Sequence, residues 1–114
     1  MSVKLTTRQV GDVTVIDANG RITLGEGSST FRDTIKDLTA RGNKKLLLNL
    51  GDVSYIDSSG IGEMVSGFTS VTNQGGELKL LNLNKRVKDL LQITKLYTVF
   101  EVFEDEAAAV RSFS

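Results

Sequence analysis

Four consecutive residues, Asp57, Ser58, Ser59 and Gly60, form the part of the sequence best suited to chemistry. They follow a dense apolar run at residues 46–50 and a short polar link, and they precede apolar residues at helical spacing. This pattern predicts a buried strand followed by a helix whose first turn contains the four residues. The N–H groups of a first helical turn are unpaired and carry partial positive charge. Such a turn can hold a serine hydroxyl outward and accommodate an anion.

A phosphate on Ser58 would change what can bind over this turn. It adds about −1.5 to −2 charges and three acceptor oxygens. The helix dipole tolerates the anion, whereas the carboxylate of Asp57 beside it opposes that benefit. Because the domain need not unfold, the main effect falls on a partner docked over the helix start, through repulsion and loss of dry contact. The residues therefore predict an on/off switch for binding.

A plainer interpretation of the same residues is a helix cap. Asp57 or Ser58 alone would satisfy N–H groups of the first turn and contribute about 1 kcal/mol. However, Gly60 and Gly62 each lower helix propensity by roughly 1 kcal/mol. Two glycines beside exposed hydroxyls favour close approach of another group to the backbone, or else packing of the helix against a sheet. The sequence leaves both explanations open.

The composition removes most enzymatic mechanisms. Cysteine and histidine are absent, which excludes thiol catalysis, Ser-His-Asp triads and the commonest metal ligands. Among 114 residues, 14 basic residues balance 14 acidic ones, so no long-range field attracts nucleic acid or an anionic membrane. We predict a binding protein rather than an enzyme, with no cofactor and no metal ion.

The remaining candidate features predict surface rather than sites. Lys44-Lys45 and the basic cluster at residues 85–88 are expected to be solvated, because no aromatic residues are interleaved with them. The spacing of the acidic residues matches no known metal loop; those considered are Asp17, Asp52, Asp57 and Glu63. No apolar run approaches the roughly 20 residues that cross a bilayer, and residues 1–9 lack the apolar region of a signal peptide. We therefore expect no membrane insertion and a cytoplasmic location.

The elements that position the switch begin with a predicted β-hairpin. Alternating runs that start at Val3 and Val13 are joined by Gly11-Asp12, a link short enough for a tight turn. Gly20 is predicted to end the second strand, and Gly25-Glu26-Gly27 to form a mobile surface loop.

The rest of the chain alternates helices and strands. The first helix has N-cap candidates Ser28, Ser29 and Thr30, with Asp33 completing a loose capping box, and Gly42 ends it. The later elements are a strand at 46–50, a helix from 57 to 75, a strand at 78–81, a helix over 83–91, a strand at 98–103 and a helix over 104–113. This order predicts an α/β fold with a single mixed β-sheet of about five strands and about four helices packed against it. Residues 1–114 are expected to form one domain.

The switch belongs to a longer pattern, Leu48-Asn49-Leu50, then Asp52-Val53-Ser54-Tyr55-Ile56-Asp57-Ser58-Ser59-Gly60-Ile61-Gly62. Gly75-Gly76-Glu77-Leu78 before a strand, Val87, Leu90 and Leu91 in the following helix, and the opening hairpin add to it. On these residues the chain resembles the STAS family of anti-sigma factor antagonists, over nearly its whole length.

The resemblance implies partner switching. In this family the unphosphorylated antagonist binds an anti-sigma factor that is also an ATP-using serine kinase, and the sigma factor is released for transcription. The kinase phosphorylates the first serine after the aspartate, which is Ser58 here, and a serine phosphatase reverses the change. ATP belongs to the partner, so the resemblance implies no cofactor for this chain. The neutral surface favours a monomer when the protein is free.

The resemblance also implies a docking surface. Asp57 would orient the Ser58 hydroxyl and the partner, and the surface would be shaped by Ser59, Gly60, Ile61 and Gly62, with Leu24 and Glu26 on the nearby loop. Family members often carry an aspartate in a Gly-x-Leu-Asp pattern. Here Gly20-Arg21-Ile22-Thr23 lacks it, which points to a subfamily with a different kinase.

A second hypothesis keeps the fold and removes the switch. Some STAS proteins are scaffold subunits of stress-sensing or transport-associated assemblies, without phosphorylation. In such a protein Ser58 would only cap the helix. The sequence does not separate this hypothesis from partner switching.

Overall fold

A mixed five-stranded sheet is the centre of the computed structural model, which describes residues 3–113 apart from the side chain of Glu26. In chain order the elements are β1 (Val3–Val10), β2 (Val13–Ile22), α1 (Glu26–Ala40), β3 (Lys45–Ile56), α2 (Ser58–Asn73), β4 (Glu77–Leu81), α3 (Lys85–Ile93), β5 (Val102–Phe103) and α4 (Glu106–Ser112). The strands lie in the order β1-β2-β3-β4-β5. β1 runs antiparallel to β2, and the other neighbours are parallel. The predicted fold class is confirmed.

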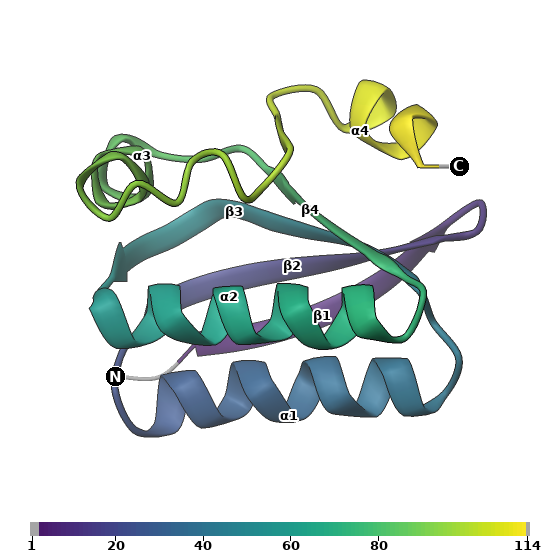
Figure 1. Ribbon diagram of the computed structural model, residues 1–114, viewed down its shortest axis with the longest axis horizontal. Helices are drawn as coiled ribbons and strands as arrows, with labels where there is room; N and C mark the ends of the chain where they lie inside the picture. The colour runs from purple at the N-terminus through teal and green to yellow at the C-terminus, as the bar shows by residue number, and fades with distance from the viewer. Residues whose placement is uncertain (1–2, 114) are drawn as a thin grey trace.

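The two faces of the sheet are covered by different helices (Figure 1). α1 and α2 lie side by side against one face, where Phe31, Ile35 and Met64 join the larger buried cluster. α3 adds Val87 and Leu91 to the same cluster. α4 lies on the other side of the sheet and packs Ala109 and Phe113 against residues of β2, β3 and β4 in a second, smaller cluster. The dense apolar run of β3 contributes Leu46, Leu48 and Leu50 to the larger cluster and Leu47 to the smaller one, so this part of the strand is buried on both faces.

Because β2, β3 and β4 are parallel, their carboxyl ends lie at one edge of the sheet. β2 and β3 are in register there, with Arg21 opposite Tyr55 and Ile22 opposite Ile56. The chain leaves this edge into α1 after Ile22 and into α2 after Ile56. The starts of both helices are therefore placed beside each other, as expected for a site at the carboxyl ends of parallel strands.

The prediction for the end of β2 and the start of α1 is wrong in detail. Gly20 does not end β2, because a shift in register between Gly20 and Arg21 lets the strand continue to Ile22. Gly20 takes a positive φ of 115° there. Residues 25–27 are not a loop: Gly25 is the N-cap, with no side-chain cap, and the helix begins at Glu26.

The proposed cap of α1 is also wrong, because Ser28, Ser29 and Thr30 lie inside the helix, as does Asp33. Instead, the Ser28 hydroxyl donates to the Thr23 carbonyl at 2.8 Å and fastens the helix to the end of β2. The predicted stop at Gly42 holds: α1 ends at Ala40 and Gly42 has a φ of 89°.

Two strand lengths differ from the prediction. The link that was expected between the apolar run of residues 46–50 and Asp57 is part of β3, which continues to Ile56 because β2 pairs with it that far. The last strand, expected over 98–103, is limited to Val102–Phe103, which pair with Leu80 and Leu81.

An ion-pair network ties α4 to the hairpin and gives a first prediction. Arg8 of β1 donates to Asp17 of β2 at 2.7 Å and to Glu106 of α4 at 3.0 Å. The hydrogen bonds from Arg8 hold the pKa of both carboxyl groups below their usual values. Because the unfolded chain binds more protons than the folded one between the two pKa values, the network stabilises the fold near neutral pH and this contribution is lost on acidification.

We expect Arg8→Gln to lower the free energy of unfolding at pH 7 by about 0.5–1 kcal/mol, the size typical of exposed pairs. The difference from the wild type should shrink as the pH falls through about 4 and should vanish below the folded-state pKa values. Urea unfolding at pH 7 and pH 3 measures both. Lys4→Gln on β1 is the control, since Lys4 is exposed and pairs with no carboxylate that the structure describes; an equal loss in that variant would contradict the prediction.

Candidate functional site

Asp57 joins the starts of α1 and α2 at the carboxyl edge of the sheet. Its Oδ1 accepts a hydrogen bond from the Gly60 N–H at 2.8 Å, which caps α2. Its Oδ2 accepts from the Leu24 N–H at 3.2 Å, and its own N–H donates to the Ile22 carbonyl at 3.3 Å. The carboxylate therefore has two structural tasks: it caps a helix and it holds the β2–α1 connection against that helix.

We expect the two tasks of Asp57 to separate in a pair of variants. Asp57→Asn retains one acceptor for the Gly60 N–H, but its NH2 group faces the Leu24 N–H, so stability should fall by about 1 kcal/mol. Asp57→Ala loses both bonds and should cost about 2 kcal/mol. Hydrogen exchange by NMR measures each bond: the Leu24 amide should exchange faster in both variants, and the Gly60 amide only in Asp57→Ala. Equal protection of Leu24 in all three proteins would contradict this assignment.

Ser58 is the first residue of α2, and its side chain is exposed. Within residues 3–113 its hydroxyl has no hydrogen-bond partner. The cap is made by Asp57, so the hydroxyl is not needed to satisfy the helix start. An exposed serine beside free helical N–H groups is accessible to an enzyme and can carry an anion.

The other residues of the predicted docking surface differ in accessibility. Gly62 is exposed, and Ser59 is half-buried. Gly60 and Ile61 are buried, with Ile61 only 2% exposed in the main core. Gly60 and Ile61 can therefore shape a surface only through the position that they give to α2.

The two glycines of the first turns have different surroundings. A Cβ on Gly60 would collide with the Ile22 carbonyl oxygen and would lie 2.7 Å from Cγ1 of Ile56. A Cβ on Gly62 would meet nothing within 4 Å. The two explanations left open by the sequence thus apply to different positions: Gly60 allows α2 to pack on the sheet, whereas Gly62 leaves an open surface.

A groove lies between the starts of α1 and α2. The part of the groove at the helix starts, called the upper hollow below, has a volume of about 470 Å³. Its lining includes Leu24, Ser28, Ser59, Gly62 and Glu63. Leu24 is 78% exposed, so the groove has an apolar side chain at the end nearest Asp57. Glu26 is the first residue of α1, and its side chain is outside the part of the chain that the structure describes.

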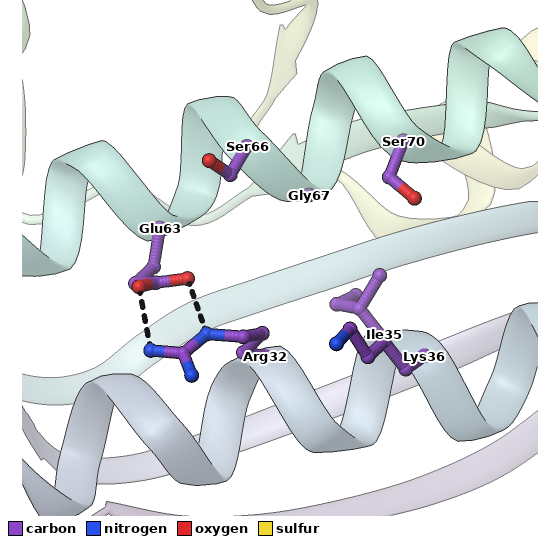
Figure 2. A pocket seen from close by; sticks show the side chains of 7 residues that line it. All are labelled: Arg32, Ile35, Lys36, Glu63, Ser66, Gly67 and Ser70. Carbon is purple, nitrogen blue, oxygen red and sulfur yellow. Dashed lines mark hydrogen bonds and ion pairs between the residues drawn. The ribbon is translucent and has the colours of Figure 1, made fainter.

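Figure 2 shows the continuation of this groove, a second hollow of about 240 Å³ between the middles of the two helices. Arg32 of α1 and Glu63 of α2 face each other across it and form two hydrogen bonds, of 3.0 and 3.3 Å. Both residues also line the upper hollow. The sequence alone does not indicate this pair, because no local pattern relates two residues on separate helices.

The other acidic candidates do not gather with Asp57. Asp17 is paired with Arg8 and Glu63 with Arg32, while Asp52 is exposed on β3. In the described part of the chain, no three residues of the types that bind metals lie close enough together to hold an ion. Over the same residues, no helix has the length and apolar character needed to span a bilayer.

The fold, a mixed sheet with the Asp-Ser-Ser-Gly turn at its carboxyl edge, defines the class of protein. The family model described as "STAS domain" matches residues 4–109. The chain therefore belongs to the STAS domain family.

The chain also resembles individual proteins in sequence and solved structures in fold. The anti-sigma-B factor antagonist of Bacillus subtilis is 40% identical over 72 residues, which are 63% of this chain and 65% of that protein. An anti-sigma factor antagonist from Mycobacterium paratuberculosis has a TM-score of 0.86 at 15% identity, over 98% of this chain and 94% of that one. The anti-sigma factor antagonist SpoIIAA in its unphosphorylated form gives 0.71 at 19% identity, over 96% of both chains.

Proposed function

We propose that this chain is an anti-sigma factor antagonist whose binding is switched by phosphorylation of Ser58. In its unphosphorylated form it binds an anti-sigma factor and thereby frees a sigma factor. The anti-sigma factor acts as an ATP-dependent serine kinase on Ser58, and a serine phosphatase restores the binding form. The chain is a regulatory protein rather than an enzyme, acts as one STAS unit over residues 1–114, and works as a cytoplasmic monomer when free.

The observation that carries the proposal is the environment of Ser58. The hydroxyl is exposed at the first turn of α2 and has no hydrogen-bond partner among the described residues, because Asp57 caps the helix. A residue needed only as a cap would have its oxygen on an N–H group of the turn. The names of the relatives support the same function, since the matched Bacillus subtilis protein is an antagonist of an anti-sigma factor.

The docking surface of the proposal surrounds Ser58. It comprises the exposed side of the α2 start, with Ser59 and Gly62, and the neighbouring Leu24 of the β2–α1 connection. Asp57 holds these two segments together through its bonds to Gly60 and Leu24. A phosphate on Ser58 adds a dianion at the centre of this surface, which a partner in dry contact cannot accommodate.

Phosphate transfer tests the proposal. Any ATP-binding protein that is encoded beside this chain is a candidate kinase. Each candidate is incubated with the protein and ATP, and the protein is then analysed by mass spectrometry. We expect one phosphate, on Ser58, and none in Ser58→Ala. Ser59→Ala is the matched control and should accept phosphate like the wild type. Protein purified from its own cells in different growth states without any phosphate on Ser58 would favour the scaffold hypothesis instead.

A further inference from the structure

Two arginines at the carboxyl edge of the sheet stack on one aromatic ring. The Cζ atoms of Arg21 and Arg86 lie 4.9 and 4.6 Å from the centroid of the Tyr55 ring. Arg21 comes from the end of β2, Tyr55 from the end of β3 and Arg86 from the first turn of α3. Three segments distant in the sequence thus bring two positive charges to one place.

These two arginines differ from three of the other arginines in the chain. Arg8, Arg32 and Arg41 are each paired with a carboxylate. Arg21 and Arg86 are exposed, and neither pairs with any carboxylate that the structure describes. No N–H group of either guanidinium donates a hydrogen bond to another described residue, so both side chains keep N–H groups available for a bidentate contact with a carboxylate.

Arg21, Tyr55 and Arg86, called the stack below, lie on segments that are held in place close to Ser58. Arg21 is opposite Tyr55 in the β2–β3 pairing, and the next residue, Ile22, accepts from the Asp57 N–H. On the other side, the Asn84 side chain caps α3 through the Val87 N–H at 2.9 Å and also donates to the Val53 carbonyl of β3. The Asn84 side chain therefore holds the start of α3, which carries Arg86, against β3, and these residues share their edge of the sheet with the start of α2.

We infer that Arg21, Tyr55 and Arg86 form a docking surface for a carboxylate-rich segment of a protein partner. The charges are complementary, and the arrangement is pre-organised, which lowers the entropy lost when such a segment binds. A nucleic acid fits less well, because the chain has no net charge and the neighbouring Lys85 and Lys88 are paired with Asp89 and Glu104. The inference rests on the proposed function only in taking this segment to belong to the partner that covers Ser58.

A peptide titration followed by NMR tests this surface without a kinase. The ¹⁵N-labelled wild-type chain is titrated with a hexaglutamate peptide. We expect chemical-shift changes concentrated at residues 20–22, 54–56 and 85–87. The double variant Arg21→Gln/Arg86→Gln should bind the peptide about five- to tenfold more weakly, the effect of two exposed charge pairs. Both residues are exposed, so the fold should be retained.

The control removes the same charge elsewhere. Lys36→Gln/Arg111→Gln loses two exposed cations outside the stack and should bind hexaglutamate like the wild type. Shifts spread over all lysines, or an equal loss in both double variants, would overturn the inference. So would tighter binding of hexathymidylate than of hexaglutamate at residues 20–22 and 54–56, which would indicate a nucleic-acid site. The titration involves neither Ser58 nor ATP. A negative titration would therefore not contradict phosphorylation of Ser58, and absence of phosphorylation would not contradict this docking surface.

Discussion

Ser58→Asp should weaken binding of the anti-sigma factor by about 100-fold, whereas Ser58→Ala should bind within a factor of about three of the wild type. The carboxylate places an unpaired negative charge in the middle of the docking surface, and such a charge costs 2–5 kcal/mol when a partner desolvates it. The alanine variant removes a hydroxyl that has no partner among the described residues, so it leaves nothing unsatisfied. Isothermal titration calorimetry with the anti-sigma factor measures all three affinities.

The effect on binding should be separable from any effect on folding. An acidic residue in the first turn interacts favourably with the helix dipole by about 0.3–1 kcal/mol, while repulsion from Asp57 acts in the opposite sense. We therefore expect the thermal midpoint of Ser58→Asp to stay within a few degrees of the wild type. Thr69→Asp is the matched control, since it adds the same charge to an exposed position of α2. If Thr69→Asp weakened binding as much as Ser58→Asp, net charge rather than a switch at Ser58 would be responsible.

The order and type of the elements could be predicted because they depend on local patterns. The turn at Gly11-Asp12, the dense run of residues 46–50 and the stop at Gly42 each follow from backbone geometry or from burial. The strand boundaries that failed depend on pairing between distant segments. β2 passes Gly20, and β3 extends to Ile56, because the two strands pair along that edge. A glycine that would locally end a strand does not do so when a neighbouring strand supplies hydrogen bonds to the residues that follow it.

The candidate site likewise combines features that follow from local sequence with contacts between residues far apart in the chain. Its position, its exposed serine and a cap made by Asp57 or Ser58 could be predicted from the pattern Asp-Ser-Ser-Gly, and the structure assigns the cap to Asp57. The second hydrogen bond of Asp57, to the Leu24 N–H, joins residues 33 positions apart. The pair Arg32–Glu63 and the two arginines on Tyr55 likewise join separate elements. Such contacts have no periodicity or motif in one sequence, and only the packed structure reveals them.

The largest effect on folding should come from Gly60→Ala, and Gly62→Ala should have the opposite sign. The new methyl group at position 60 would collide with the Ile22 carbonyl oxygen and lie 2.7 Å from Cγ1 of Ile56. Both neighbours belong to paired strands, so α2 would have to move away from the sheet. We expect a loss of about 3 kcal/mol in the free energy of unfolding, at the upper end of the cost of overpacking. Urea unfolding measures it.

Gly62→Ala tests whether the glycine at this uncrowded position allows a partner to approach the backbone. The methyl group at position 62 meets nothing within 4 Å, and alanine favours a helix by about 1 kcal/mol over glycine. The variant should therefore unfold at higher urea concentration than the wild type. If a partner approaches the backbone at this turn, the same methyl group should lower its affinity about tenfold, measured by calorimetry beside Ser58→Ala. A more stable protein that binds the anti-sigma factor less well would locate the contact at Gly62, because a defect in folding cannot explain that combination. Unchanged affinity would place the contact elsewhere on the surface around Ser58.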